Sequence, residues 1–330
     1  MMRWVPIDDR SVIAALRRQA RREGMAAGLS DRRLDEIAIV VTEALTNVLR
    51  YAGTGRALLN VNAEPGRRPL TLVVADNGPG IADLETLRRD GKSSSGSAGL
   101  GLGAIERLSD QFDIFSEKGG GTVLVAGFGE PNPGGMEGLT VEGLRVCHPA
   151  EQLCGDDWFL RIDGGAADIF LCDGLGHGRR ANQAAQEVVA TALSFNAPPA
   201  QTLARTSAAM TGHRGAVAAM LRLLPAQGKL TYSGLGNIAT ISFSGDGSRR
   251  FAVRDGRIGG AATEGFQEDR DIAPGSLYIM HSDGLRTLRD PQLPPSLLRR
   301  SPLLVAGWLM DRNFRGRDDA SIVVAKVEAG

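Results

Sequence analysis

The chain has 330 residues and a formal net charge of zero, because 38 Lys and Arg balance 38 Asp and Glu. A hydrophobic content of 42% with 23% charged residues excludes an intrinsically disordered chain. The zero net charge gives no electrostatic reason to expect a nucleic acid or a membrane as a partner, and 5% aromatic residues disfavour base stacking. The length predicts two domains.

The cysteines and the N-terminus indicate a protein of a reducing compartment. Cys147, Cys154 and Cys172 cannot all pair and show no CxxC spacing, which argues against a disulfide framework or a structural zinc site. The first residues, MMRWVPIDDRS, lack the apolar core of a signal peptide. The longest apolar stretch, around 302–310, is shorter than the roughly 18 residues that a membrane span needs. We therefore expect a cytoplasmic protein.

A segment rich in proline and glycine, FGEPNPGGMEG, divides the chain. Such a composition opposes both helix and strand, and an apolar strand candidate lies on each side of it. We therefore expect a first domain over residues 1–127, a linker over 128–138 and a second domain over 139–330.

The first domain reads as strand, helix, helix, strand, strand, loop, helix, strand, strand. Ser30 or Asp31 is the expected N-cap of the second helix, which carries an apolar stripe at helical spacing. Helices on one sheet predict a two-layer α/β sandwich. The expected helices are 11–27, 31–51 and 102–108, and the expected strands after the first are 57–63, 70–75, 111–116 and 122–126.

The second domain reads as many strands around two helices, 179–194 and 199–210, with a third helical stretch over 295–311. The pattern predicts a β-sandwich covered by helices, with a meander over 217–253. The other expected strands are 139–147, 159–162, 168–172, 276–281 and 321–327.

Three motifs of the first domain share a chemistry. Glu43 and Asn47 lie at i, i+4 on one helix face, where they could hold a water and a cation beside a phosphate chain, although a solvated Glu with a polar neighbour is the simpler interpretation of this pair alone. The DNGPG segment 76–80 is an ordinary turn or an acid poised to accept from the amine of a base. The glycines of 96–103 precede a helix and could bind phosphates through backbone amides, or form a flexible linker.

The order of these motifs within 61 residues, from 43 to 103, resembles the Bergerat-type ATP-binding fold of the GHKL superfamily. The segments TEALTNVLRYAGTG, ADNGPGI and DGKSSSGSAGLGLGAIERL are most similar to the RsbT type of anti-sigma-factor Ser/Thr kinases. The resemblance implies that Asn47 holds Mg²⁺, that Asp76 binds adenine and that Glu43 is the general base toward a partner's hydroxyl. The implied ATP-binding residues are Asn47, Asp76, Gly78, Gly80, Gly96, Gly99, Gly101, Gly103 and Thr122.

Four aspartates of the second domain stand where strands end or turn: Asp156, Asp173, Asp283 and Asp318. Each has a Gly or another Asp beside it, so any one of them alone is simply a turn residue. Together they offer the hard oxygen ligands that suit Mg²⁺ or Mn²⁺, and two such ions can activate a water for attack on phosphorus.

This constellation is similar to the PPM-type Ser/Thr phosphatases, in the SpoIIE branch and most closely the RsbX type, which have an αββα sandwich. The resemblance implies that Asp173 bridges two metals and that the Gly174 carbonyl is a ligand. Asp283 and Asp318 would complete one metal site and Asp156 would serve the other, while Asp157 and Asp319 rank lower. The chain departs from the family at Gly155, where larger relatives have an acid, and no residue clearly replaces their phosphate-gripping arginine.

The two resemblances together imply a bifunctional regulator. One domain would phosphorylate a STAS-domain protein with ATP and Mg²⁺, and the other would dephosphorylate such a protein with two Mn²⁺ or Mg²⁺. An alternative is an ATP-binding partner-switch domain that gates the phosphatase without kinase activity, and a third is a phosphatase domain used only as a scaffold. The partner's identity, the upstream signal and the oligomeric state stay open.

Overall fold

The computed structural model describes residues 2–62, 64, 67–81, 98–129, 135–260, 266–288 and 293–328. The chain forms two compact units. The first comprises Met1–Asn132 together with Arg299–Asp311, and the second comprises Pro133–Leu298 and Arg312–Gly330. Within the described ranges, no helix is long and apolar enough to cross a membrane.

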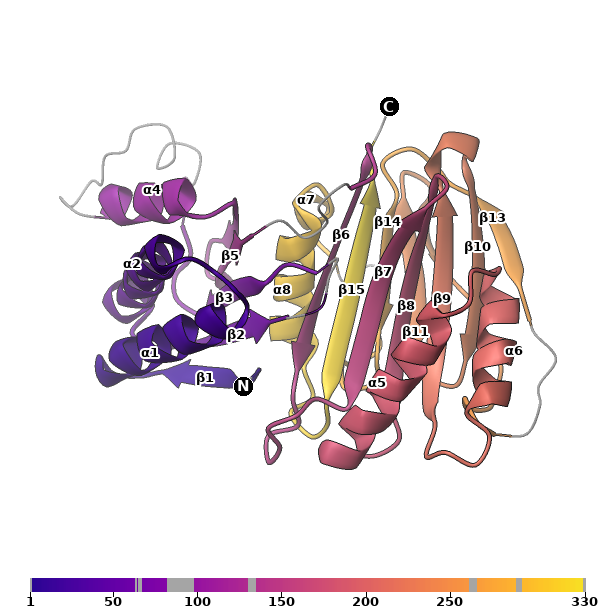
Figure 1. Cartoon of the computed structure of the whole chain (residues 1–330). Helices are drawn as coiled ribbons and strands as arrows, with labels where there is room; N and C mark the ends of the chain where they lie inside the picture. Colours follow the sequence, from indigo (N-terminus) through magenta and orange to yellow (C-terminus); the bar gives the residue numbers. More distant parts are fainter. Residues whose placement is uncertain are drawn as a thin grey trace. The chain divides into compact units, whose positions relative to one another are not determined.

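The first unit is an antiparallel sheet with three helices on one face (Figure 1). The strand order is β1-β2-β3-β5-β4, as expected for an α/β sandwich. Its elements are β1 (Trp4–Ile7), α1 (Ser11–Ala26), α2 (Asp31–Asn47), a π-helical turn (Val48–Ala52), β2 (Gly55–Val61), β3 (Leu70–Asp76), α4 (Ala98–Leu108), β4 (Gln111–Glu117) and β5 (Gly121–Phe128).

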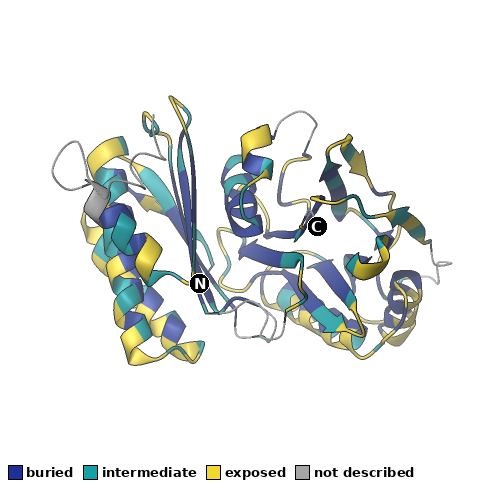
Figure 2. Cartoon of the chain, turned by 90° about the horizontal axis from the view of Figure 1, so that it is seen from above, coloured by how far each residue is buried: buried dark blue, intermediate teal, exposed yellow. Residues whose placement is uncertain are grey.

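Helix α2 illustrates how the sequence sets the local structure. Ser30 is its N-cap, and the Ser30 side chain accepts a hydrogen bond from Arg33 N at 3.4 Å. Leu34, Ile37 and Leu45 recur at helical spacing and are fully buried in the core between the helices and the sheet. Figure 2 shows the buried strands of this sheet and the exposed outer surfaces of its helices.

The opposite face of the same sheet is covered by α8 (Pro302–Asn313), which comes from the C-terminal part of the chain (Figure 1). A Cβ atom on Gly307 would lie 2.9 Å from Val125 Cγ1 and 3.2 Å from Val73 Cγ1, so the helix packs closely on β3 and β5. The Trp308 ring meets Phe115 edge-on at 6.5 Å. Sequence analysis assigned 139–330 to the second domain as one block, whereas Arg299–Asp311 belongs to the first unit.

The reason for this third layer lies in the strands. Alternate residues of a strand face opposite sides, and both sets are apolar in β3, where six residues in a row are buried. A continuous apolar run is typical of a strand that is covered on both faces. The run Leu70–Ala75 was therefore a signal that a two-layer sandwich would leave one apolar face uncovered.

The second unit contains two five-stranded antiparallel sheets, β13-β10-β9-β8-β7 and β12-β11-β14-β15-β6. Helices α5 and α6 pack on the first of these sheets (Figure 1). Its elements are β6 (Leu139–Val146), β7 (Asp156–Asp163), β8 (Ala166–Gly174), α5 (Arg179–Leu193), α6 (Pro199–Ala209), β9 (Ala216–Leu224), β10 (Lys229–Leu235), β11 (Ala239–Ser244), β12 (Gly247–Arg250), β13 (Glu268–Asp271), β14 (Leu277–His281), α7 (Pro295–Leu298) and β15 (Ala320–Val327).

The alternation along β7 and β8 separates two cores. Trp158 and Ile169 point into the core between the two sheets, whereas Phe159 and Phe170 stack at 5.1 Å in the core beneath the helices. A β-sandwich covered by helices is therefore correct for this unit.

Two details of the predicted second domain are wrong. The stretch 217–253 is not a meander, because β10 and β11 lie in different sheets and the chain changes sheet at Gly236, whose φ is +96°. The single helix over 295–311 is two helices, α7 and α8, because Pro302 has no N–H to continue a helix and begins a new one.

The packing of α8 makes a testable prediction. Replacing Gly307 with Leu should lower the free energy of unfolding by about 1–3 kcal/mol, because the added side chain must displace Val73 and Val125. The measurement is urea unfolding of the full chain. Ala204→Leu, at an exposed position of α6, is the matched control. Equal stability of the two variants would contradict the tight packing of α8 on this sheet.

Candidate functional site

The first candidate site lies where α2 ends. Glu43 and Asn47 leave the same face of the helix, and a π-helical turn follows Asn47 directly. Such turns are frequent at functional sites. Gly101 of α4 faces both side chains, since a Cβ atom there would lie 2.6 Å from Glu43 Oε2 and 3.8 Å from Asn47 Nδ2. The structure therefore brings three of the expected residues together and explains why one of them is glycine.

The end of β3 supplies the second part of this site. Asp76 lies directly opposite Thr122 in the β3–β5 register. The Asp76 Oδ1 atom accepts a hydrogen bond from Gly78 N at 2.8 Å, which closes an Asx-type turn. A side chain on Gly78 would meet Ala52 Cβ at 2.6 Å, next to the π-helical turn. The turn interpretation of DNGPG is therefore confirmed, and the adenine-binding role of Asp76, which lies beside Thr122, stays a prediction.

The remaining glycines divide into three kinds. Gly80 has a φ of +71°, and a Cβ atom there would lie 2.0 Å from Glu117 O, so its role is to permit the backbone path. Gly99 and Gly103 lie in α4. Gly96 lies outside the described residues, as does the rest of the serine-rich segment, so the expected lid stays a prediction.

The second candidate site lies at one edge of the second unit. Asp156 begins β7 and stands opposite Asp173 near the end of β8, so these two carboxylates come from neighbouring strands of one sheet. Asp283 follows β14 and Asp318 precedes β15, which are neighbouring strands of the other sheet. The four aspartates, distant in sequence, are thus all at strand ends, as expected.

Asp156 is fully buried and joins the two sheets. Its Oδ2 atom accepts hydrogen bonds from Ser282 Oγ at 2.5 Å and from Ser321 Oγ at 2.7 Å. Its Oδ1 atom is buried and has no hydrogen-bond partner. Burial, opposed by the two serine hydroxyls, raises the pKa of Asp156 to about 7. One oxygen is therefore fixed by the protein, and the other is left for a ligand.

Burial and, after it, repulsion between neighbouring carboxylates raise the pKa values of these aspartates. Burial and then the neighbouring charges of Asp156, Asp283 and Asp318 raise the pKa of Asp173 to about 10. Burial and Asp318 also raise the pKa of Asp283, while Arg315 and a hydrogen bond from Asn237 Nδ2 at 2.8 Å act in the opposite direction. Carboxylates arranged in this way favour a bound cation.

The donor set fits divalent cations. It consists of carboxylate oxygens, which Mg²⁺ and Mn²⁺ prefer, and the buried Oδ1 of Asp156 has no hydrogen-bond partner among the described residues and is available to a ligand. As they stand, no three His, Cys, Asp or Glu side chains among the described residues are close enough to hold one ion. Asp283 is exposed and Asp318 is exposed, so these two can turn inward toward a metal, whereas Asp156 is fixed.

Glycines shape the loops around the aspartates. A Cβ atom on Gly174 would lie 2.3 Å from Ala181 O, which leaves no room for a side chain beside Asp173. A Cβ atom on Gly155 would lie 2.7 Å from Asp319 Oδ2. Gly155 therefore lies against the carboxylate of Asp319, which directly precedes β15.

The two lower-ranked aspartates have different surroundings. Asp157 forms a buried ion pair with Arg145 at 2.7 Å and thus stabilises the fold. Asp319 accepts a hydrogen bond from His148 N at 2.8 Å, and its buried Oδ2 atom has no hydrogen bond of standard geometry within the described residues, although Gly155 and Cys154 lie close enough to lower the pKa of this carboxyl. Asp319 is therefore the better placed of the two for a role beside the metal ligands.

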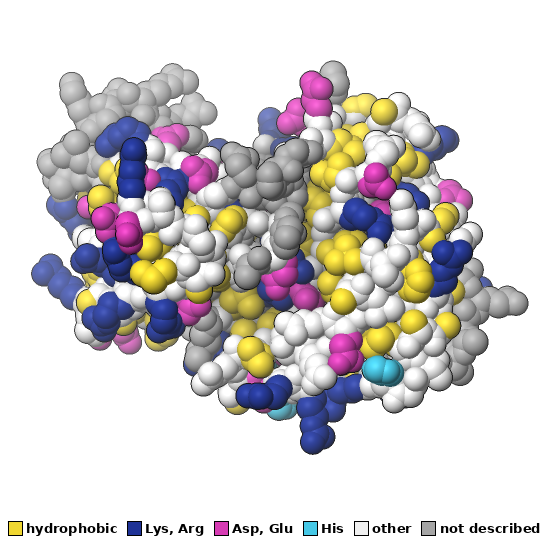
Figure 3. Space-filling model, in the orientation of Figure 1, with side chains coloured by type: hydrophobic (Ala, Val, Ile, Leu, Met, Phe, Trp, Pro, Cys, Tyr) yellow, Lys and Arg dark blue, Asp and Glu magenta, His cyan; other side chains and the backbone are white. Residues whose placement is uncertain are grey.

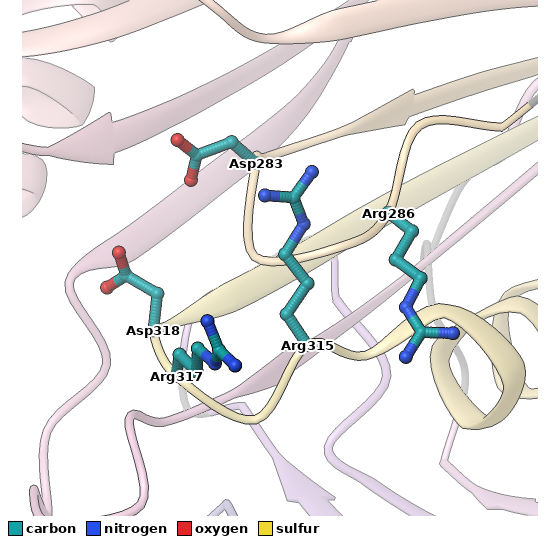
Figure 4. A pocket seen from close by; sticks show the side chains of 5 residues that line it. All are labelled: Asp283, Arg286, Arg315, Arg317 and Asp318. Carbon is teal, nitrogen blue, oxygen red and sulfur yellow. The ribbon is translucent and has the colours of Figure 1, made fainter.

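Sequence analysis missed the residues that hold or flank the carboxylates. Ser282 precedes Asp283 in HSDG, Asn237 belongs to TYSGLGNI, and Ser321 is the second residue of the last strand, so the signal was their place next to motif residues. A pocket of about 390 Å³ also lies here, lined by the segment that follows β14 and the segment between α8 and β15 (Figure 4). It is lined by Asp283, Arg286, Arg315, Arg317 and Asp318.

Two known families match separate parts of the chain. The histidine kinase-like ATPase domain family matches residues 5–127, and the Stage II sporulation protein E (SpoIIE) family matches residues 163–328. The chain therefore belongs to both families and joins an ATPase domain of the histidine kinase-like type to a PPM-type phosphatase domain.

Particular relatives resemble each half. Serine/threonine-protein kinase RsbT of Bacillus subtilis is 33% identical over 114 residues, which are 34% of this chain and 86% of the relative. Phosphoserine phosphatase RsbX of the same organism is 27% identical over 137 residues, which are 41% of this chain and 69% of the relative. An anti-sigma F factor of Clostridium beijerinckii is 30% identical over 101 residues, which are 28% of this chain and 68% of the relative.

Two solved structures share the phosphatase fold. A chain described under "The bacterial stressosome: a modular system that has been adapted to control secondary messenger signaling" has a TM-score of 0.52 and 26% identity, and the match covers 57% of this chain and 100% of that chain. RsbX in complex with magnesium has a TM-score of 0.51 and 23% identity, with 59% of this chain and 98% of that chain covered. The expected fold of the C-terminal domain is confirmed.

The repulsion between the aspartates of the second candidate site predicts how a bound metal ion changes the thermal stability of the protein. Mn²⁺ should raise the melting temperature of the wild type, because the ion binds only the folded arrangement of carboxylates. Asp173→Asn should melt above the wild-type temperature without metal, since a pKa raised to about 10 means that folding at neutral pH must protonate Asp173, a cost that Asn does not carry, and it should lose most of the Mn²⁺ effect. Calorimetry measures both. Asp246→Asn, at an exposed turn, is the control, and an undiminished Mn²⁺ effect in Asp173→Asn contradicts the assignment.

Proposed function

We propose that the chain is a bifunctional regulator of a partner-switching pathway. Its C-terminal domain hydrolyses phosphoserine or phosphothreonine on a STAS-domain protein with two Mn²⁺ or Mg²⁺, and its N-terminal domain phosphorylates such a protein with ATP and Mg²⁺. The observation that carries the proposal is the meeting of Asp156, Asp173, Asp283 and Asp318 at strand ends of one sandwich.

The phosphatase chemistry follows from what these side chains can hold. Bound metals would supply an activated water and charge stabilisation for in-line attack on phosphorus. Asp173, opposite Asp156 and half-buried among like charges, would bridge two cations, with the Gly174 carbonyl as a further ligand. Asp283 and Asp318 would complete one site, while Asp156, held by two serines, would serve the other.

The kinase chemistry rests on the α2 face. Asn47 would hold Mg²⁺ against the phosphates, and Asp76 would accept from the adenine amine beside Thr122. Glu43 would take the proton of the partner's hydroxyl. Phosphoryl transfer asks a protein mainly for positioning and charge stabilisation, so few side chains are needed.

Similarity to RsbT, RsbX and a stressosome structure supports a STAS-domain partner of the anti-sigma-factor-antagonist or scaffold type. A single chain that carries both activities raises the local concentration of each at one docked partner. The cytoplasmic location is part of this proposal, and the three cysteines are buried and free, as a reducing compartment allows.

A second candidate function is favoured by the path of the chain. The segment between Asp283 and Asp318 includes Arg299–Asp311, which is built into the ATPase unit. Asp311 accepts a hydrogen bond from Arg56 Nε at 2.7 Å, and Asp113 accepts one from Ser301 N at 2.9 Å. Nucleotide binding could therefore gate the phosphatase through α8 without any phosphoryl transfer.

The phosphatase proposal predicts a specific loss of activity. With Mn²⁺, the wild type should remove phosphate from a phosphorylated STAS-domain protein, followed by intact mass. Asp173→Asn should be at least about 100-fold slower, because the loss of a bridging ligand removes several kcal/mol of transition-state stabilisation. Asp246→Asn should act like the wild type. A fully active Asp173→Asn variant would refute the two-metal assignment.

A pair of variants distinguishes the kinase from the gating alternative. Glu43→Ala should slow labelling of the STAS protein by about 100-fold or more and leave ATP affinity within about threefold, because a general base acts only in the transition state. Asp76→Ala should weaken ATP binding by about tenfold or more, since it removes a charged hydrogen-bond acceptor. Nucleotide titration and mass analysis measure the two effects. If the wild type binds ATP but never labels a partner, gating is the function.

A further inference from the structure

The pocket beside Asp283 and Asp318 is rich in arginine. Arg286, Arg315 and Arg317 line it, and all three are exposed. None of their guanidinium groups forms a hydrogen bond or an ion pair with any described residue, although Arg315 is close enough to lower the pKa of Asp283. The pocket therefore holds three positive groups whose partner is not in the described part of the chain.

The backbone fixes Arg315 relative to Asp283. Arg315 N donates a hydrogen bond to Gly284 O at 2.9 Å, and Arg286 N donates one to Asn313 O at 2.8 Å. Leu285 and Phe314 form a bridge between these two bonds. The loop that carries one expected metal ligand is thus joined to the segment that carries the arginines.

The side chains point in different directions. In Figure 4 the carboxylates of Asp283 and Asp318 lie on the same side of the pocket, and Arg315 extends from its segment toward Asp283. Arg317 lies beside Asp318, whereas Arg286 extends away from both carboxylates. Arg315 and Arg317 are therefore the arginines that could act together with groups held by the two aspartates.

The charges suggest what these arginines bind. When Asp283 and Asp318 neutralise a divalent cation, their negative charge is no longer available to Arg315 and Arg317. A phosphoryl group brought to that cation carries the anionic oxygens that a guanidinium binds well, because its planar N–H groups match two oxygens at once. The sequence analysis found no clear equivalent of the arginine with which the phosphatase relatives bind substrate phosphate. The pocket supplies arginines that could bind phosphate, and they come from the segment that follows α8.

We propose that Arg315, with Arg317 beside it, binds the phosphate of the substrate at the phosphatase site. This inference rests on the phosphatase activity proposed above. It names the residues that recognise the phosphoryl group and assigns them to the segment that follows α8. Arg286 lines the same pocket but is not part of the grip.

The test is calorimetric titration of the Mn²⁺-loaded full chain with inorganic phosphate, alongside steady-state hydrolysis of the phosphorylated STAS protein. Arg315→Ala should weaken phosphate binding and raise KM by about 10- to 100-fold, as loss of a charged hydrogen bond does. Arg317→Ala should have a smaller effect in the same direction. Arg315→Lys should bind phosphate better than Arg315→Ala but less well than the wild type, because lysine keeps the positive charge and lacks the planar guanidinium that binds two oxygens at once. Mn²⁺ affinity should not fall in any of the three variants, because all of them keep the carboxylates that would hold the ion.

The controls separate this inference from the function on which it rests. Arg205→Ala, at an exposed position of α6 outside the pocket, should behave as the wild type. If the wild type hydrolyses no phosphoprotein, the proposed function fails, and phosphate titration still decides the role of Arg315. Unchanged phosphate affinity in the Arg315→Ala, Arg317→Ala double variant overturns the grip, and so does a wild type that binds no phosphate.

Discussion

The Asp156 carboxylate, shared between two serine hydroxyls, is the contact on which the phosphatase site depends. Asp156 begins a strand of one sheet, while Ser282 and Ser321 belong to the ends of neighbouring strands in the other. Ser321 N also donates to Ser282 Oγ at 3.0 Å, so the three residues form one buried network. Such a network joins the edges of two sheets at a fixed spacing, and it orients one carboxylate oxygen of Asp156 away from the protein's own donors.

The remaining carboxylates repel one another, and a bound cation would offset the free-energy cost of this repulsion. Asp156 and Asp173 lie in strands of one sheet, while Asp283 and Asp318 lie next to strand ends of the other sheet. Their negative charges therefore repel one another at this end of the sandwich. The protein tolerates this arrangement because Asp283 and Asp318 are exposed and Asn237 and Arg315 partly compensate Asp283. The same segment, between Asp283 and Asp318, supplies a helix to the ATPase unit and the arginines of the pocket. One stretch of about 35 residues, between two proposed metal ligands, thus contributes both to the candidate site and to the packing of the ATPase unit.

The sequence was informative where local rules decide the structure. The cap at Ser30, the apolar stripe of α2 and the aspartates at strand ends follow from spacing alone, and the structure has them as expected. The change of sheet between β10 and β11 was not predictable in this way, because period-two patterns do not say which sheet a strand joins. Strand β13, with the sequence EDRD, was missed because an edge strand can be charged throughout. The sequence analysis did not predict that α8 covers the sheet. The apolar run Leu70–Ala75 and the almost continuously apolar sequence of the helix, PLLVAGWLM, both indicated a sheet face that is covered.

The site shows the same limit. The aspartates could be predicted because each of them belongs to a local sequence motif. Ser282, Ser321 and Arg315 could not, because they reach the site through contacts between segments far apart in the chain: the serines donate to Asp156, and the Leu285–Phe314 bridge holds the Arg315 segment. The most direct test of the central claim is anomalous X-ray scattering from crystals of the Mn²⁺-loaded protein. The account predicts two peaks about 4 Å apart, with Asp173 between them and the free oxygen of Asp156 facing one. A single peak away from Asp173, or no peak at these aspartates, would contradict it.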